Sequence, residues 1–527
     1  MARQREKWGT RVGAILAVTG SAVGLGNFLR FPGQAAKYGG GAFMIPYIIA
    51  FLIVGLPLAW AEWSLGRYGG AMGHNSVPGI FRSLTKRRSG AYIGLLGTLM
   101  PVMIYMYYVF VEAWCLSYAW EFMVGSFAEF GSDAKLIGEH FETSVGAGAN
   151  GAVFSSSAWR MLVFVGICFV VNFIMIYRGV SKGIEKFCNI AMPLLVVCAI
   201  IVLVRVLTLG APVPDQPDQN VVNGLGAMWN PTKPDMTLVE TLSNPEIWLA
   251  ATGQIFFSLS VGFGLILTYA SYLKRDDDVA LSSLTAAAGN GFCEVVLGGM
   301  IVIPVAFMFL GQGVVDNPPG TFGMGFVALP NVFNQMPAGQ LFGFLFFFLL
   351  FLAAVTSSLS MLQPSIALLE EGLGIGRKAS VTILSFITLT GATFIVYFSK
   401  GFTAMDTIDF WMANFFIFIL ATFQVILFSW IVGIDKGMDE LRRGAEIRMP
   451  NFLKIVLKYI APLYLIVIFA LWCYYNLPGR VKAIFSPPEG EPPVVLMSLG
   501  LILVVAAFFA LIVNLANKRW DEQEASK

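Results

Sequence analysis

Charged residues are scarce in this sequence. Asp, Glu, Lys and Arg make up 13% of the 527 residues, whereas hydrophobic residues make up 57%. Soluble domains carry about 25% charged residues. A chain of this length with so little charge cannot cover a surface that faces water on every side, so it must face lipid. The 34 Lys and Arg residues nearly balance the 32 Asp and Glu residues. No basic run is long enough to indicate a nucleic-acid-binding protein.

Cysteine and histidine are also rare. The two histidines, His74 and His140, are far apart, and no CxxC or HExxH spacing indicates a zinc site. We expect no removable signal peptide in the short, charged N-terminal segment. No Asn-x-Ser/Thr acceptor occurs, because Asn230 precedes a proline, and this favours a bacterial source. The cysteines all lie in apolar stretches, which argues against a disulfide framework: Cys115, Cys168, Cys188, Cys198, Cys293 and Cys473.

Long apolar runs, by contrast, are abundant. About 20 apolar residues cross a bilayer as one helix. The runs predict an all-α polytopic membrane protein, a single transporter domain over 1–527, with twelve transmembrane helices at 11–36, 41–68, 91–124, 159–177, 187–208, 247–274, 280–311, 340–371, 379–399, 402–432, 452–476 and 491–516. Residues 312–339 are loop-like but partly apolar, and they predict a short outward-side helix that packs back onto the bundle.

Lys and Arg set the orientation of a membrane protein, because cytoplasmic loops carry an excess of them. They gather in the N-terminal tail, in the loops after spans two, four and ten, and in the C-terminal tail. In a model with an even number of spans, all these segments lie on one side. The sequence therefore predicts an inner-membrane protein with both termini in the cytoplasm.

Glycines interrupt two of the predicted spans. Span one contains GSAVGLGNFLRFP (Gly20 to Pro32), and span six contains GQIFFSLSVGFG (Gly253 to Gly264). Unwound backbone at membrane depth is tolerated only where it lies in protein or lines a water-filled cavity. The glycines could instead be helix-packing contacts, but the polar Asn27 and Arg30 close to the first break favour a functional site.

The positions of the two breaks indicate an inverted-repeat transporter, because spans one and six stand five spans apart. The first repeat would comprise spans one to five (11–208) and the second repeat spans six to ten (247–432). The last two spans (452–516) would be additions to the two repeats.

These motifs, together with GGGAFMIPY (Gly39 to Tyr47) and FLAAVTSSLSMLQP (Phe351 to Pro364), resemble the sodium:neurotransmitter symporters, most closely the bacterial leucine transporters among them. The resemblance covers essentially the whole chain. It implies a five-plus-five inverted repeat and sodium-driven amino acid import by alternating access. It leaves the choice between monomer and homodimer open.

The resemblance implies two Na⁺ sites built from oxygen atoms, which hard cations prefer. The first would use the Ala22 carbonyl, Asn27, Ser258, Asn290 and the substrate carboxylate. The second would use carbonyls and hydroxyls of Gly20, Val23, Ala353, Thr356 and Ser357. The residues themselves agree in kind, because Thr356, Ser357 and Ser358 form a polar cluster in a very apolar run. Such hydroxyls can also bond back to their own helix.

The resemblance also implies a substrate site at the two breaks. Amide groups of Leu25 and Gly26 and the Tyr108 hydroxyl would hold a carboxylate, since a helix N-terminus favours an anion. The substrate amine would face carbonyls near Ala22 and Phe257, with help from Ser260. The remaining contacts would come from Ile104, Ser258, Phe263, Ser357 and Met361. Monoamine carriers of the family have aspartate at the position of Gly24, so this chain is expected to take an amino acid with a medium or large apolar side chain.

Relatives that depend on chloride carry a small polar residue where this chain has Glu294. The resemblance therefore implies that the Glu294 carboxylate, near Tyr47, Gln254 and Ser258, replaces chloride. Glu294 could also carry a proton on the return of the empty carrier, or it could be a carboxylate with no role in coupling. Another intramembrane carboxylate, Glu62, is expected to bond to the broken backbone.

Two ion pairs are implied as gates: Arg30 with Asp409 on the outer side, and Arg5 with Glu371 on the cytoplasmic side, where Trp8, Tyr272 and Gln363 would lie nearby. An intramembrane enzyme is disfavoured because no catalytic constellation is present. A channel is disfavoured because no filter-like sequence occurs. A sensor would not need gates on both sides. A proton-coupled amino acid carrier is the nearest alternative, and Thr356 with Ser357 favours sodium over it.

Overall fold

The computed structural model describes residues 6–155, 158–231, 237–485 and 492–525, and these ranges contain helices but no β-strand. Ten helices are long and apolar enough to cross a membrane, and α1 with η1–α2, bent by 46° at a short break, adds an eleventh crossing. The predicted sixth span corresponds to α13 and α14, which residues 260–264 separate. The predicted twelve spans are therefore reached when each broken helix is counted as one span.

The first five spans, with short π-helical and 3₁₀ turns (η) at several joints, follow the predicted order. Their elements are α1 (Arg11–Ala22), η1 (Gly26–Arg30), α2 (Phe31–Lys37), α3 (Gly41–Ala50), η2 (Phe51–Gly55), α4 (Leu56–Ala71), α5 (Val77–Thr85), α6 (Arg88–Gly94), α7 (Leu96–Val124), η3 (Ser126–Phe130), α8 (Ala134–Val145), η4 (Ala152–Phe154), α9 (Trp159–Tyr177), η5 (Val180–Glu185) and α10 (Lys186–Leu207).

The next five spans begin after two short helices. Their elements are α11 (Val221–Trp229), α12 (Leu238–Ser243), α13 (Pro245–Leu259), α14 (Leu265–Ala270), α15 (Val279–Gly291), η6 (Phe292–Gly299), α16 (Met300–Leu310), α17 (Gln312–Asp316), α18 (Gly320–Gly323), η7 (Met324–Ala328), α19 (Leu329–Gln335), α20 (Gly339–Leu373), α21 (Arg377–Tyr397), η8 (Lys400–Phe402), α22 (Thr403–Asp409), η9 (Phe410–Phe415), α23 (Phe416–Ile426) and η10 (Leu427–Ile431).

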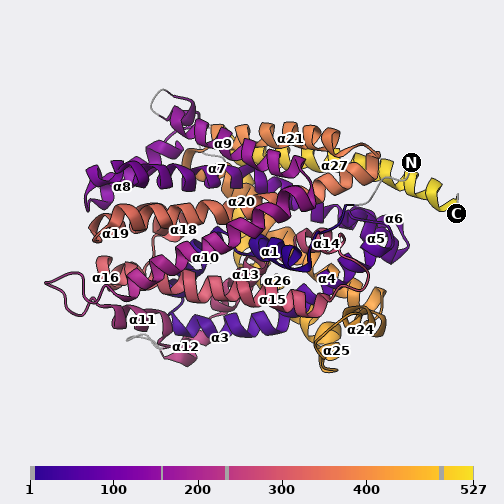
Figure 1. The fold of residues 1–527 in the computed structure, drawn as a ribbon, viewed down its shortest axis with the longest axis horizontal. Helices are drawn as coiled ribbons and strands as arrows, with labels where there is room; N and C mark the ends of the chain where they lie inside the picture. Colours follow the sequence, from indigo (N-terminus) through magenta and orange to yellow (C-terminus); the bar gives the residue numbers. More distant parts are fainter. Residues whose placement is uncertain (1–5, 156–157, 232–236, 486–491, 526–527) are drawn as a thin grey trace.

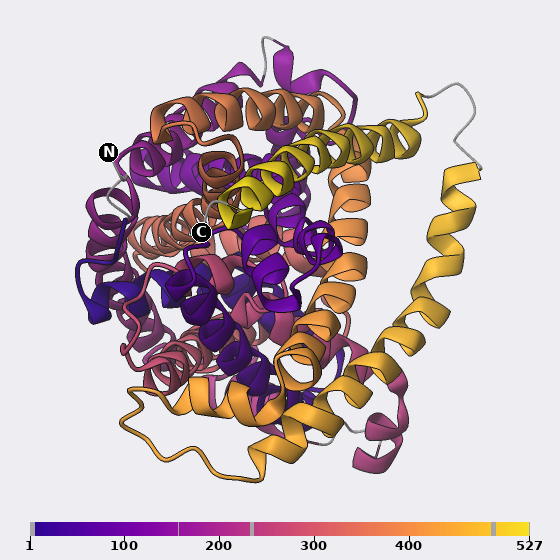
Figure 2. The same ribbon diagram turned by 90° about the vertical axis from the view of Figure 1, so that its right-hand side faces the viewer.

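Helices α26 and α27 of the last two spans are largely exposed along their lengths, and Figure 2 shows α26 at the edge of the bundle. Here the elements are α24 (Ile434–Arg442), α25 (Leu453–Ile455), η11 (Val456–Ile460), α26 (Ala461–Phe485) and α27 (Val494–Ala525). Their status as additions and the boundaries of the two repeats stay predictions.

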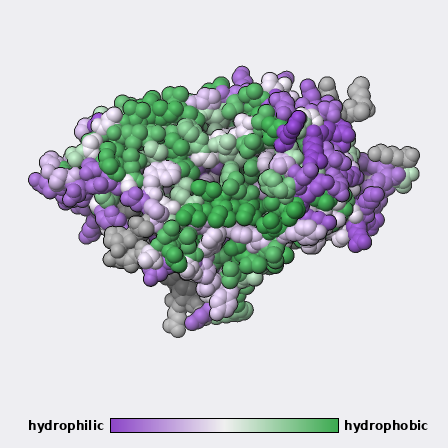
Figure 3. Space-filling model, turned by 90° about the horizontal axis from the view of Figure 1, so that it is seen from below, coloured by the Kyte–Doolittle hydropathy of each residue, from purple (hydrophilic) through white to green (hydrophobic). Residues whose placement is uncertain are grey.

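The helices lie roughly side by side, and both termini emerge at one end of the bundle, here called the terminal end (Figure 1). The opposite end, called the distal end, carries α8, α11 and α19. Figure 3 shows hydrophobic surface over the middle of the molecule and hydrophilic groups toward both ends, as a membrane-spanning bundle requires. The six cysteines are all free.

The predicted helix within 312–339 is confirmed, in four short pieces (α17, α18, η7 and α19). Met324, Phe326, Leu329 and Phe333 are buried, and α19 packs on α20. The sequence reading missed the loop helices α5, α8 and α11, whose N-caps are Ser76, Asp133 and Asn220. Short amphipathic helices of this kind give no long apolar run, so the criterion used for spans cannot detect them.

Candidate functional site

The two helix breaks face each other at the centre of the bundle. Helix α1 ends at Ala22, and α13 ends at Leu259, followed by Ser260, which holds a left-handed backbone at φ 53°. The Ser260 hydroxyl donates to the Ser21 carbonyl at 2.8 Å, so one break caps the other. Glu62, fully buried on α4, accepts a hydrogen bond from the Gly262 amide at 3.0 Å. The expected support of broken backbone by Glu62 is thus seen at the second break.

A cavity of about 90 Å³ lies between these breaks. Its lining residues come from the first break, α7, the second break and α20, and all of them are uncharged: Ser21, Ala22, Gly24, Gly26, Asn27, Pro101, Ile104, Tyr107, Tyr108, Phe257, Ser260, Phe263, Leu265, Ser357 and Met361. Most of the expected substrate contacts are among them. Leu25 and Ser258 are not, although the Leu25 amide donates to the Tyr108 hydroxyl at 3.4 Å.

The sequence reading missed Pro101, Tyr107 and Leu265. Pro101 lies three residues before Ile104 on α7, and residues at that spacing share one face of a helix. That spacing could have identified Pro101. Leu265 is the first residue of α14, directly after the second break. Only the three-dimensional position of the break turns it toward the cavity.

Gly24 lies against the cavity wall. A Cβ atom at this position would approach the Ser357 hydroxyl to 2.9 Å and the Tyr108 hydroxyl to 3.2 Å. The neighbouring Gly26 differs, because a Cβ there would meet nothing within 4 Å. The absence of a side chain at position 24 therefore maintains the space between α1, α7 and α20.

The oxygens expected at the first Na⁺ site form one buried network. Asn27 Oδ1 accepts from the Gly24 amide at 2.9 Å, and Asn27 Nδ2 donates to Asn290 Oδ1 at 2.8 Å. Asn290 Nδ2 in turn donates to the Ser258 hydroxyl. The three side chains are at most 1% exposed and come from the first span, α13 and α15. Neutral amide and hydroxyl oxygens converging in a buried place fit a hard monovalent cation.

The residues expected at the second Na⁺ site lie where α1 approaches α20. A Cβ at Gly20 would come within 3.1 Å of the Thr356 Cβ, so glycine permits this close approach. The Thr356 hydroxyl donates to the Ala353 carbonyl at 3.0 Å, and the Ser357 hydroxyl donates to the Ser21 carbonyl at 3.4 Å. The oxygen set fits a cation, with Thr356 now bonded back to its own helix.

Glu294 is not among the residues expected to bind Na⁺, but it contacts one of them, Ser258. Its carboxylate accepts hydrogen bonds from the Tyr47 hydroxyl, the Gln254 amide and the Ser258 hydroxyl. Glu294 is fully buried within η6. These are the neighbours expected for a carboxylate in place of chloride, and Ser258 links it directly to Asn290.

At the distal side of the cavity, Arg30 and Asp409 do not form the expected ion pair. The Arg30 guanidinium instead stacks on the Phe257 ring, with Cζ 3.9 Å from the ring centre, and its Nη1 has no hydrogen-bond partner. Asp409 accepts from the Tyr107 hydroxyl at 2.6 Å and from Asn414 Nδ2 at 2.8 Å. Beyond Arg30 opens a vestibule of about 340 Å³ lined by α2, α13, α23 and α26.

The terminal side, in contrast, is covered by the segment that precedes α1. The Trp8 indole donates to the Tyr269 carbonyl at 2.8 Å. The buried Glu185 carboxylate accepts from the Gly9 amide at 2.7 Å, the Thr10 amide at 2.9 Å and the Thr10 hydroxyl at 2.8 Å. These bonds fix the start of α1 against η5, and neither Glu185 nor its role was expected from the sequence.

The expected Arg5–Glu371 gate is only partly visible, because Arg5 lies outside the described residues. Glu371 contacts the His74 ring and accepts from the amides of Asn75 (3.1 Å) and Ser76 (3.0 Å).

The expected neighbours of this gate lie close by. Gln363 donates to the Tyr272 hydroxyl at 2.7 Å and accepts from Arg377, which also pairs with Glu6 at 2.9 Å. Arg377 therefore joins the N-terminal segment to α20.

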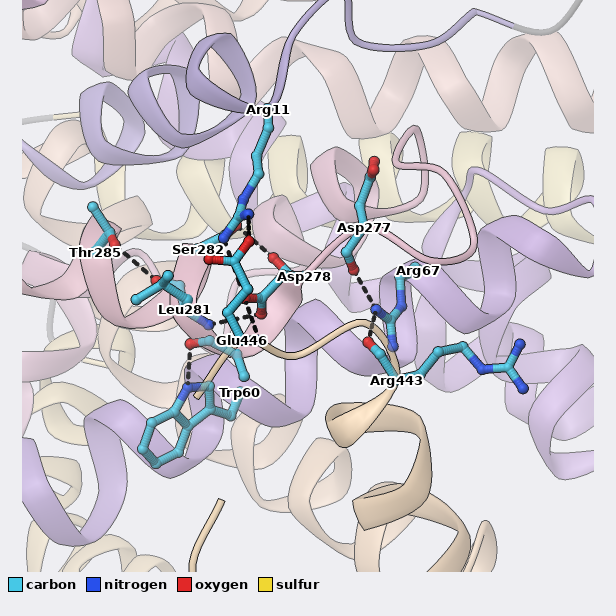
Figure 4. Close-up of polar contacts among 11 residues, drawn as sticks. Arg11, Trp60, Arg67, Asp277, Asp278, Leu281, Ser282, Thr285, Arg443 and Glu446 are labelled. Carbon is cyan, nitrogen blue, oxygen red and sulfur yellow. Dashed lines mark hydrogen bonds and ion pairs between the residues drawn. The ribbon is translucent and has the colours of Figure 1, made fainter. Parts of the chain in front are cut away.

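A second polar cluster secures the terminal end (Figure 4). Arg11, the first residue of α1, pairs with Asp278 at 3.2 Å and with Glu446 at 2.6 Å. The fully buried Arg67 on α4 donates to the carbonyls of Asp277 and Arg443 and also contacts Glu440. Ion pairs and hydrogen bonds thus join the first, second and seventh spans to α24 and the loop beyond it.

A helical membrane bundle with a neutral central cavity, a closed terminal end and a vestibule at the distal end has the architecture of a transporter that gives access to one side at a time. Similarity to known proteins identifies the family of transporters. The chain belongs to the sodium:neurotransmitter symporter family, whose model matches residues 5–130 and 150–517. Members of this family are symporters and not enzymes.

Individual relatives agree with this assignment. An uncharacterized sodium-dependent transporter of Methanocaldococcus jannaschii is 29% identical over 466 residues, covering 88% of this chain and 89% of the relative. The sodium-dependent nutrient amino acid transporter 1 of Drosophila persimilis is 26% identical, over 93% and 78% of the two chains. Among solved structures, MhsT in complex with L-phenylalanine matches with a TM-score of 0.74 and 27% identity, covering 88% of this chain and 99% of that one.

Proposed function

We propose that the protein is a Na⁺-coupled symporter that imports a neutral amino acid with an apolar side chain. The observation that carries this proposal is the cavity between the helix breaks, in which no lining residue is charged. A buried charge needs a partner. A monoamine would find no carboxylate there, whereas a zwitterion brings both of its own charges. The amino acid transporter relatives and the phenylalanine complex of MhsT support this substrate class.

In this proposal, each part of the cavity receives a part of the amino acid. The Tyr108 hydroxyl and the backbone amides at Leu25 and Gly26 bind the carboxylate, because backbone amides at a helix start favour an anion. Carbonyls near Ala22 and Phe257 accept hydrogen bonds from the amine. The apolar side chain packs against Ile104, Phe263 and Met361, and the flexible methionine adapts to its shape.

Na⁺ would supply positive charge beside the substrate carboxylate. Asn27, Ser258, Asn290 and the Ala22 carbonyl would hold it at the first site, and Gly20, Val23, Ala353, Thr356 and Ser357 at the second. Asn27 connects Na⁺ binding to substrate binding, because its side chain also accepts a hydrogen bond from the Gly24 amide at the first break. Filling the first site would therefore fix the backbone that binds the substrate, which couples the two ligands.

The proposal further assigns Glu294 the place of chloride. A fixed carboxylate beside Ser258 provides the negative charge that would otherwise come from the anion, so transport should not require chloride. The same carboxylate would take up a proton when the carrier returns empty. The protein is proposed to lie in the inner membrane with its termini, and thus the terminal end, in the cytoplasm.

Uptake of a radiolabelled amino acid panel into proteoliposomes tests the proposal, with Na⁺, K⁺ and Cl⁻ varied in turn. We expect saturable uptake that needs Na⁺ and not Cl⁻. Uptake without Na⁺ would favour the proton-coupled carrier, and binding without accumulation would favour the sensor.

The variant Glu294→Ser should become dependent on chloride, whereas Glu62→Gln, which changes a carboxylate outside this network, should not. Uptake without proton efflux would exclude the proton role of Glu294.

A further inference from the structure

The turn that joins α5 to α6 at the terminal end carries an unusual concentration of positive charge. Lys86, Arg87 and Arg88 are consecutive and exposed, and Arg82 lies one turn earlier on α5 with its side chain buried. Nothing in the substrate and ion sites uses these residues. Their charge agrees with the positive-inside rule, but that rule requires only charge and no shaped site.

These cations line a cavity of about 630 Å³, larger than the vestibule. The opposite wall is the last part of α27, and the inner wall is the loop after α4. The lining residues are Met72, Gly73, His74, Arg82, Ser83, Lys86, Arg87, Arg88, Trp520, Asp521, Gln523 and Glu524. We call this cavity the basic pocket. A concave, cation-lined site beside a membrane is the kind of place where anionic headgroups bind.

The described residues do not balance the charges of the basic pocket. Asp521 pairs with Arg82 at 2.6 Å and also with Arg88, and Glu524 pairs with Arg82 at 3.2 Å. Within the described part of the chain, no acidic side chain pairs with Lys86 or Arg87. The carboxylate contacts show that the pocket can bind oxyanions, and two cations remain available for one more.

The backbone gives an independent observation. Lys86 closes α5 in the left-handed conformation, at φ 55° and ψ 29°. Glycine is the usual residue at such a helix end, because a side chain there is strained. Residues held in strained conformations cluster at binding sites. Here the strain fixes a lysine at the mouth of the pocket.

The pocket also adjoins the closure of the terminal end. The Trp520 ring lies edge-on to His74 at 5.5 Å, and the Arg82 guanidinium stands 5.4 Å from the same ring. His74 contacts Glu371 in the last turn of α20. An occupant of the pocket would therefore act on the contacts that join α27, the loop after α4 and α20.

We propose that the basic pocket binds a phosphate-bearing anion, either the headgroup of an anionic phospholipid or a soluble phosphate. Lys86 and Arg87 would contact the phosphate oxygens, while Arg82 and Arg88 keep α27 in place through Asp521 and Glu524. Occupancy stabilises the packing of α27 against α5. The proposal does not depend on which substrate the central cavity carries.

Thermal unfolding of the full chain in nanodiscs tests this, with phosphatidylcholine alone or mixed with phosphatidylglycerol. The double variant Lys86→Ala/Arg87→Ala is compared with Lys182→Ala/Lys186→Ala, which removes two exposed cations from η5 and the start of α10. Phosphatidylglycerol should raise the unfolding midpoint of the wild type and the control. Because both cations that would contact the phosphate oxygens are lost, the double variant should lose most of that shift. An equal shift in all three proteins would overturn the proposal.

Two further arms make the result specific. Inorganic phosphate, titrated into phosphatidylcholine nanodiscs at constant ionic strength, identifies a soluble ligand if it reproduces the stabilisation, and a headgroup if it does not. The single variant Lys86→Gly separates strain from binding. It should unfold at a higher temperature than the wild type in phosphatidylcholine and yet respond less to the anion. An undiminished response in Lys86→Gly as well as in the double variant would exclude the site.

Discussion

The two ends of the bundle are held in different ways. At the terminal end, Glu185, Arg377, Arg11 and Arg67 join the start of α1 and its neighbours through charged hydrogen bonds. At the distal end, Arg30 stands unpaired beside Phe257 below an open vestibule. Closure at the terminal end thus depends on many contacts, whereas closure at the distal end would need a single ion pair, that of Arg30 with Asp409. An alternating-access cycle would need to break the first set and form the second.

The largest expected effect is on the buried arginine of the terminal end. Arg67→Met should lower the free energy of unfolding by about 3–5 kcal/mol, because the Glu440 carboxylate and the carbonyls of Asp277, Glu440 and Arg443 lose a charged partner. Unfolding by titration with a denaturing detergent measures this. Arg480→Met, an exposed arginine near Phe410 at the distal end, should cost less than about 1 kcal/mol. Equal effects of the two changes would contradict the comparison.

The cavity between the two ends is tested at two adjacent glycines. Gly24→Ala should weaken amino acid binding by about tenfold or more, because the new methyl group overpacks against Ser357 and Tyr108. Gly26→Ala is the matched control, since its Cβ meets nothing within 4 Å. Equilibrium binding of a labelled amino acid at saturating Na⁺ gives both values. If Gly26→Ala were the more damaging change, the assignment of the cavity wall would be wrong.

The seal at the start of α1 should depend on the Glu185 carboxylate. Glu185→Ala leaves the amides of Gly9 and Thr10 without their acceptor, and losing a charged hydrogen bond costs about 1.5–3 kcal/mol. Hydrogen–deuterium exchange of residues 9–14 should accelerate by about tenfold or more. Glu185→Gln keeps one acceptor oxygen and should lie between the wild type and alanine. Unchanged exchange in the alanine variant would show that the Glu185 carboxylate is not needed to close this side.

The smallest expected effect is at the distal gate. Tyr107→Phe removes one of the two donors that hold Asp409, so Asp409 becomes freer to pair with Arg30. Closure should be favoured by about 1 kcal/mol, and the bound amino acid should dissociate about fivefold more slowly. Dissociation of a labelled ligand after dilution measures the rate. Asn414→Ala removes the other donor and should act in the same direction, and opposite effects would refute a competition for Asp409.

Much of the architecture follows from sequence alone. Apolar runs located the spans, because lipid requires about 20 apolar residues per crossing wherever they stand in the chain. Most ends agree closely, but the predicted spans 452–476 and 491–516 stop well before the ends of α26 at Phe485 and α27 at Ala525, where the helices continue past the apolar run. The glycine motifs located both breaks, because glycine favours unwound backbone and such backbone is tolerated at membrane depth only where protein or a water-filled cavity surrounds it. The sixth span, whose helices α13 and α14 are each too short to cross a membrane alone, was still predicted, because its break was recognised as part of the pattern.

The hydrogen-bond and ion-pair partners of individual side chains could not be predicted from the sequence in the same way. In the sequence, Glu185, Arg377 and Arg67 look like ordinary charges near span ends. Glu185 bonds to the Gly9 amide and Arg67 to the Asp277 carbonyl, and both partners are more than 170 residues away in the chain. The contact of Glu371 with His74 and the unpaired state of Arg30 are likewise properties of one conformation.

The sequence by itself determined that this chain crosses the membrane repeatedly, breaks two of its helices at the centre and places no charge at position 24. These are local properties of composition and helix propensity, which act along the chain. Only the tertiary structure decided that the breaks cap each other through Ser260, that the cavity is neutral throughout and that the terminal end is the closed one. Such facts depend on which distant groups meet, and burial makes each unpaired polar group costly enough to select one arrangement.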